Sequence, residues 1–167
     1  VSRNVSTVSG DVFVGSGARI KGGVTAVSGD IEIGSKAFVQ NVEVVSGNIS
    51  VGKGASAVQL ETVSGDVNCD SGSDISENIM TVSGDIELDD SRLRGNLKTV
   101  SGDISLFNGS MIDGDIIINR KSNAVLFHDG KLKIIIDMNS VVKGSILVEE
   151  PNSNVIVYLA NGGKVKG

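Results

Sequence analysis

The phrase Val-Ser-Gly followed by Asp or Asn occurs six times in the chain. The copies begin at Val8, Val27, Val45, Val63, Val82 and Val100. Successive copies are separated by 18 or 19 residues. A fixed period is typical of solenoid proteins, in which each repeat is one structural unit that stacks on the next. This period constrains the fold more strongly than any other feature of the sequence.

Aliphatic residues recur within each repeat at 4, 6, 10, 12 and about 16 positions after the Val of the phrase. In the second repeat these are Ile31, Ile33, Ala37, Val39 and Val42, and we expect Val27 to face inward with them. The spacing does not fit a helix, and the frequent Gly and Ser residues disfavour one. It predicts short strands separated by polar corners, with three hexads making three faces. The predicted fold is therefore an all-β, single-stranded, three-sided β-helix (β-solenoid) of about eight coils of 18–19 residues.

The repeat continues beyond its last signature phrase, and we expect a single domain over residues 1–167. Residues 1–118 form the regular coils, and residues 119–131 form an inserted loop. The segments "KIIIDMNSVVKG" and "VYLANGGKVKG" keep the same offsets, which predicts two further coils over 132–167 with a loop near 149–155. Eight coils at a strand spacing of about 4.8 Å would make a rod about 38 Å long.

The third residue of the phrase is always glycine, which predicts a corner. A glycine there indicates positive φ or a close approach of backbones between coils. We expect the preceding Val to be an inward anchor, and the Ser and Asp or Asn to point outward and bond the turn backbone. The predicted corner glycines are Gly10, Gly29, Gly47, Gly65, Gly84 and Gly102.

Composition restricts the core and the partners. The chain has 22 glycines, no Trp and only 3% aromatic residues, so the core must consist of β-branched and other aliphatic side chains. Cys69 occupies one of the aliphatic offsets and is predicted to be a buried core residue. The net charge of −5 argues against a nucleic-acid partner, and no apolar run is long enough to span a bilayer.

A column of acidic residues follows the corner glycines, and it is the candidate metal site. Stacked carboxylates are potential Ca²⁺ ligands, but like charges repel and the column includes Asn48, which favours a role in the corner. We therefore expect no bound metal and no cofactor, and we expect Lys133 to cap the column in the next coil. The candidate calcium column comprises Asp11, Asp30, Asp66, Asp85 and Asp103.

The only histidine lies in the inserted loop, in the segment Phe127, His128 and Asp129. A His-Asp pair can act in acid–base catalysis, but no nucleophile or second carboxylate is placed by spacing to work with it. We therefore predict no catalytic residue and treat these three residues as a candidate interaction loop. Phe13 and Phe38 fall at offsets that predict outward-facing side chains.

The segments "IGSKAFVQNVEVVSGNISVGKGA" (33–55) and "NSVVKGSILVEE" (139–150) resemble bactofilins, the polymer-forming bacterial β-helix proteins. The Val-Ser-Gly-Asp ladder also resembles the β-solenoids of putative adhesins. The resemblance implies a right-handed coil and a non-enzymatic, exported or envelope-associated structural protein. The chain starts at Val1 without Met, so we expect that an upstream segment has been removed.

These observations predict a rigid rod for self-assembly or adhesion in the bacterial envelope. The expected partners are the protein itself, or envelope and surface components, with no transmembrane segment. Two alternatives stay open: a carbohydrate-active or acyl-transferring β-helix enzyme, and a calcium-binding adhesin. The expected location is the periplasm, envelope or cell surface, with a cytoplasmic cytoskeletal role as the alternative.

Overall fold

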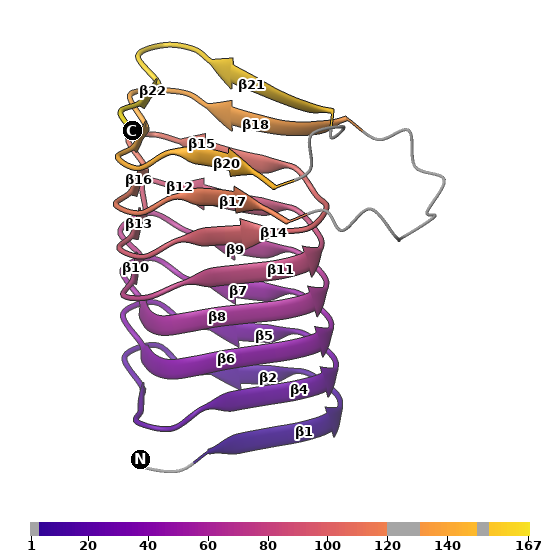
Figure 1. Cartoon of the computed structure of the whole chain (residues 1–167). Coiled ribbons are helices and arrows are strands. Elements are labelled where there is room, and N and C mark those ends of the chain that lie inside the picture. The colour runs from indigo at the N-terminus through magenta and orange to yellow at the C-terminus, as the bar shows by residue number, and fades with distance from the viewer. Residues whose placement is uncertain (1–3, 120–130, 150–153) are drawn as a thin grey trace.

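In a computed structural model, which describes residues 4–119, 131–149 and 154–167, every regular element is a β-strand. The strands form a three-sided solenoid, with one strand per face in each of eight turns (Figure 1). Face A comprises β1 (Val5–Ser9), β4 (Val24–Ser28), the second parts of β6 (Phe38–Ser46) and β8 (Ser56–Ser64), β11 (Ile79–Ser83), β14 (Leu97–Thr99), β17 (Ile116–Ile118) and β20 (Ile146–Val148). Face B comprises β2 (Val12–Val14), β5 (Ile31–Ile33), β7 (Ile49–Val51), β9 (Val67–Cys69), β12 (Ile86–Asp89), β15 (Ile104–Phe107), β18 (Leu132–Ile136) and β21 (Val155–Leu159). Face C comprises β3 (Arg19–Ile20), the first parts of β6 and β8, β10 (Asp74–Ile75), β13 (Arg92–Leu93), β16 (Met111–Ile112), β19 (Val141–Val142) and β22 (Lys164–Val165).

All strand pairs are parallel and join each coil to the equivalent residues of the next. The chain runs from left to right along face A, returns behind it along face B, and rises toward the C-terminus, so the coil is right-handed (Figure 1). Ile104 pairs with Ile134, and Ile134 pairs with Val157. These registers place the extra residues between β17 and β18 and between β20 and β21, as the sequence predicts.

The core is a continuous stack of aliphatic side chains from all three faces. Ile31, Ile49, Ile86 and Ile104 are at most 1% exposed and occupy one inward column of face B. Burying a side chain of this size stabilises the fold by about 1.5–3 kcal/mol. Because the column repeats in every coil, each coil gains most of its burial from its two neighbours, as expected for a solenoid.

A column of small residues follows the turn into face C, where the interior is narrow. Ala37 and Ala55 fill it in two coils, and buried serines fill it farther along the rod. Ser91 Oγ lies 2.7 Å from the carbonyl oxygen of Asp89, and Ser110 Oγ lies 2.8 Å from that of Leu88. These two hydroxyls bond backbone carbonyls inside the solenoid, which offsets the cost of burying them, whereas the buried Ser140 Oγ of the same column has no hydrogen-bond partner among the described residues.

The prediction that the Val of the repeated phrase faces inward is wrong. Side chains alternate along a strand, and the inward residue of β4 before the corner is Ala26, which is fully buried. Val27, one position later, therefore points to solvent and is 47% exposed. The same shift applies in the next coil, where Val44 is buried and Val45 is 50% exposed.

Candidate functional site

The corner between faces A and B, hereafter the VSG corner, brings the backbones of successive coils very close together. Gly29, Gly47 and Gly65 have φ values of 129°, 149° and 148°, a region that favours glycine. A Cβ built on Gly65 would lie 2.0 Å from the carbonyl oxygen of Gly47. The corner position thus requires both a positive φ and the absence of a Cβ, so no residue other than glycine fits it without displacing the adjacent coil.

The residue after each corner glycine forms a hydrogen-bonded ladder along the rod, hereafter the aspartate ladder. The backbone N–H of Asp30 donates to Oδ1 of Asp11 at 2.9 Å, and the N–H of Asn48 donates to Oδ1 of Asp30 at 2.7 Å. The ladder continues to Lys133, whose N–H donates to Oδ1 of Asp103 at 2.8 Å. The partner of each side chain is therefore the next coil, not its own turn. Lys133 ends the ladder through its backbone amide rather than its ammonium group.

Each ladder carboxylate uses one oxygen for a backbone amide, and an asparagine oxygen serves equally well. The N–H of Asp66 donates to Oδ1 of Asn48 at 2.8 Å, within the range of the aspartate members. Over the described residues, no group of three or more His, Cys, Asp or Glu side chains is placed to hold a metal ion. The ladder geometry is thus explained by hydrogen bonding between coils.

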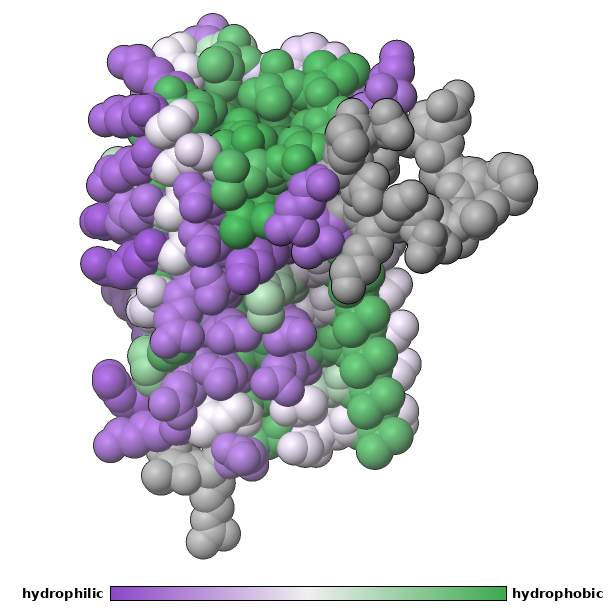
Figure 2. Space-filling model, in the orientation of Figure 1, coloured by the Kyte–Doolittle hydropathy of each residue, from purple (hydrophilic) through white to green (hydrophobic). Residues whose placement is uncertain are grey.

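A line of exposed valines runs along the VSG corner, and we call it the valine stripe. Its members are the first residues of the six repeated phrases: Val8, Val27, Val45, Val63, Val82 and Val100. The first five are between 44% and 76% exposed, and Val100 is half-buried. Figure 2 shows the stripe as a green column along the right-hand edge of the lower half of the rod. The fold does not need these apolar side chains, because the core is complete without them.

Carboxylates surround the valine stripe on both sides. The aspartate ladder lies directly across the corner, and the next outward column of face B contributes Glu32 and Glu87. On face A the adjacent outward column contributes Glu43, Glu61 and one base, Lys98. The other described bases of these six coils lie on face C or at its corners: Arg19, Lys21, Lys36, Lys53, Arg92 and Arg94. The valine stripe is therefore an apolar line along an edge of the rod whose flanking side chains are mostly acidic.

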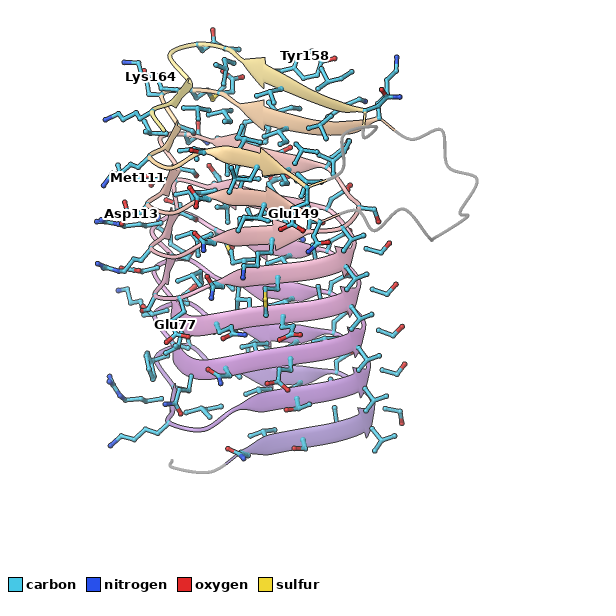
Figure 3. The ribbon with its side chains drawn as sticks, in the orientation of Figure 1. Glu77, Met111, Asp113, Glu149, Tyr158 and Lys164 are labelled. Atoms are coloured by element: carbon cyan, nitrogen blue, oxygen red, sulfur yellow. The ribbon has the colours of Figure 1, made fainter. Side chains whose placement is uncertain are left out.

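A shallow hollow of about 270 Å³ lies on face A, and its lining includes Asn119 and Glu149. Its outward column is Glu61, Met80, Lys98 and Ile117, and Glu149 lies at its upper margin (Figure 3). The hollow mixes apolar, acidic and basic side chains without a cluster of groups suited to one reaction. As a concave surface with both apolar and charged side chains, it is a secondary candidate for binding.

Face C carries the described ion pairs and lies away from the valine stripe. Asp113 accepts from Arg92 at 2.6 Å and from Lys143 at 2.7 Å, and it lies on the left-hand side in Figure 3. The Lys143 ammonium, opposed by partial burial and aided by Arg92, lowers the pKa of the Asp113 carboxyl. A second ladder joins the coils at the corner between faces C and A, where Asn78 and Asn96 accept from the next coil. These features stabilise the stacking of coils.

The remaining predicted residues are placed as follows. Cys69 is buried in the core on face B, and burial raises the pKa of its thiol to about 12. Phe13 is 66% exposed, and the Arg19 guanidinium carbon lies 4.6 Å from the centre of the Phe38 ring. Phe127, His128 and Asp129 lie outside the described residues. Within the described ranges, no helix is long and apolar enough to cross a membrane.

The sequence interpretation missed the valine stripe, the charge segregation and the hollow. The signal for the stripe is the strict alternation in Thr-Ala-Val-Ser, where two consecutive apolar residues cannot both face inward. The hollow is lined by residues far apart in the sequence, from Glu61 to Glu149, which the stacking of coils brings together.

The sequence model of one protein family, described as Toastrack DUF4097, matches residues 4–155 of the chain. No curated protein and no solved structure matches it. The family match supports the β-solenoid repeat that the resemblance implied. It confirms neither the bactofilin nor the putative-adhesin assignment.

Proposed function

The chain belongs to the Toastrack DUF4097 family, and from this premise we propose that it is a non-enzymatic interaction rod of the bacterial envelope. The rod binds a partner side-on through the valine stripe, in the manner of an adhesion or scaffold protein. The solenoid supplies rigidity, because every coil is hydrogen-bonded to its neighbours on three faces. The family match and the fold agree with a structural role.

The observation that carries this proposal is the valine stripe. Exposed apolar residues that occur singly on a protein surface are normal, whereas a contiguous apolar patch marks an interaction site. Five valines with at least 44% exposure, one per coil, form a single line about 19 Å long at the usual strand spacing. Val, Thr and Ile all suit an exposed strand position, so strand propensity does not require valine here.

Co-sedimentation with envelope fragments from the organism that carries the gene tests this proposal. We expect the native chain to sediment with the fragments and the triple variant Val27→Thr, Val45→Thr, Val63→Thr to remain in solution. Threonine keeps the shape and the strand preference of valine while removing its apolar character. Val141→Thr on face C is the matched control and should behave as the native chain. If the native chain itself stays in solution, or if all three proteins sediment alike, the proposal is wrong.

End-to-end self-assembly is a second candidate, favoured by the last coil. Val157 and Leu159 pair with the buried Ile134 and Ile136, yet they are 39% and 53% exposed because no described strand covers them. A strand edge with apolar neighbours can pair with another copy. Sedimentation velocity over a concentration series tests this candidate: we expect the sedimentation coefficient to rise with concentration. A constant value for one rod would exclude it.

The two alternatives from the sequence have their own tests. A calcium-binding adhesin requires a higher melting temperature in Ca²⁺ than in chelator, since a ligand that binds only the folded state stabilises it. A β-helix enzyme requires an activity that is lost in His128→Ala. We propose that neither effect will be observed.

A further inference from the structure

We infer that the partner of the VSG corner is a basic amphipathic helix, whose aliphatic side chains pack on the valine stripe while its Lys and Arg residues meet the flanking carboxylates. This inference deepens the proposed function and rests on it. It is carried by charge and by the dimensions of the stripe.

The charge around the stripe selects the sign of the partner. In the six coils that carry the repeated phrase, nine carboxylates flank the valines and one lysine accompanies them. Asp11, Asp30, Asp66 and Asp85 are exposed, so their second carboxylate oxygens are accessible to a cation. Complementary charge across an interface speeds association and excludes wrong partners. The acidic flanks are Asp11, Asp30, Asp66, Asp85, Asp103, Glu32, Glu87, Glu43 and Glu61.

The same charge argues against a second copy of the chain on this edge. Two stripes packed together would bring two acidic flanks into contact, and like charges so placed cost several kcal/mol. Nucleic acids and anionic lipid surfaces are repelled for the same reason. A partner that covers the valines must therefore bring positive charge.

The length and the repeat of the stripe favour a helix over a strand. Six valines at about 4.8 Å per coil span about 24 Å, which is about 16 residues of α-helix. One turn of α-helix rises about 5.4 Å, so an apolar row on a helix nearly matches the valine spacing. On a β-strand, side chains of one face recur every 6.4–6.8 Å, which does not match the coil repeat. Lys and Arg on both sides of the apolar row then reach faces A and B.

The aspartate ladder provides a variant that removes charge without disturbing the fold. Asn48 already accepts the inter-coil hydrogen bond in the native chain. The triple variant Asp30→Asn, Asp66→Asn, Asp85→Asn should therefore keep the ladder and lose three charges beside the stripe. The control Asp70→Asn, Asp89→Asn, Asp90→Asn removes the same charge at the corner between faces B and C.

The probe is an 18-residue synthetic helix with Leu on one face and Lys elsewhere, and its comparison peptide has Glu in place of Lys. A fluorophore on Val63→Cys reports coverage of the stripe, and Cys69 will not compete for labelling because it is buried. We expect the Lys peptide to bind at least tenfold more tightly than the Glu peptide. We also expect at least a tenfold loss with the ladder variant or with 0.5 M salt, and no change with the corner control.

The outcomes separate this inference from the proposed function. If the valine-to-threonine variant loses binding to envelope fragments but the ladder variant does not, the stripe is an interaction surface and the basic helix is the wrong partner. Equal binding of the Lys and Glu peptides, or equal loss in the ladder variant and its control, also overturns the inference. Concentration-dependent dimers that disappear in the valine-to-threonine variant would identify a second copy as the occupant. If the valine substitutions change none of these measurements, both proposals are wrong.

Discussion

Replacing a corner glycine in the middle of the rod should be among the most damaging single substitutions in this chain. In Gly65→Ala the new Cβ would lie 2.0 Å from the Gly47 carbonyl oxygen, whereas ordinary contact begins at 3.4 Å. The coils must separate locally by about 1.4 Å. This stretches three bonds between the two coils: Gly47 N to Ser64 O at 3.0 Å, Ile49 N to Asp66 O at 2.9 Å, and the ladder bond from Asp66 N to Asn48 Oδ1 at 2.8 Å.

The expected loss of unfolding free energy is about 4–5 kcal/mol. Each weakened hydrogen bond contributes about 1 kcal/mol, and an alanine in left-handed backbone costs about 1–2 kcal/mol. Two other glycines separate these effects. Gly54→Ala keeps the backbone strain (φ 66°) with no atom closer than 3.7 Å, and should cost about 1–2 kcal/mol. Gly95→Ala has no positive φ but a Cβ 2.2 Å from the Glu77 carbonyl oxygen, and should cost about 2–3 kcal/mol.

Urea denaturation followed by circular dichroism measures all three variants on one scale. The predicted order of destabilisation is Gly65→Ala, then Gly95→Ala, then Gly54→Ala. If Gly65→Ala is no more damaging than Gly54→Ala, the close approach of the coils does not control stability, and the explanation of the repeated glycine is wrong.

Three further predictions follow from individual side chains. Asp66→Asn should change stability by less than about 0.5 kcal/mol in urea denaturation, whereas Asp66→Ala, which removes the acceptor of the Asp85 N–H, should cost about 1 kcal/mol. Thr81→Val should raise the unfolding free energy by about 1 kcal/mol because the buried Thr81 Oγ1 has no hydrogen-bond partner, while Thr99→Val, which loses a 3.1 Å bond to Ser101 O, should not. Cys69 should resist thiol reagents in the native state. Its pKa is raised from 9.0 to about 12, so its contribution to stability is complete below pH 9 and decreases as pH rises from 9 toward 12, and a Cys69→Ala variant should lack this decrease.

Most of the fold was predictable because its determinants are local and repeated. The offsets of Ile31, Ile33, Ala37 and Val39 identify inward residues in every coil, and an error in one repeat is corrected by the others. The two insertions were located because the aliphatic offsets resume after them. The prediction for Val27 is wrong because a recurring apolar residue suggests a core position. The direction of a side chain depends instead on the alternation along its strand, and Val27 directly follows an inward-facing residue.

The candidate site was less predictable, because it consists of several columns of side chains that lie side by side in the folded rod and form no motif in the sequence. The glutamates Glu43 and Glu61 are one column in register, yet nothing in the sequence near either residue shows that they border the same valines as Asp66. That neighbourhood appears only when faces A and B meet at a sharp corner. The hydrogen bond from the Asp66 amide to Asn48 likewise spans 18 residues, so the sequence permits several partners for each ladder side chain.

The misassigned valine is also the most informative residue of the repeat. Glycine at the corner is required by the backbone, and the residue after it is required by the ladder, so both are explained by folding alone. Ala26 or its equivalents already fill the inward position before the corner. Valine is then required neither by the corner backbone nor by the ladder, and a polar residue there would lower the cost of exposing it to water. Its presence in all six copies, on an edge whose acidic residues disfavour a second copy, is the reason for proposing a partner outside the chain.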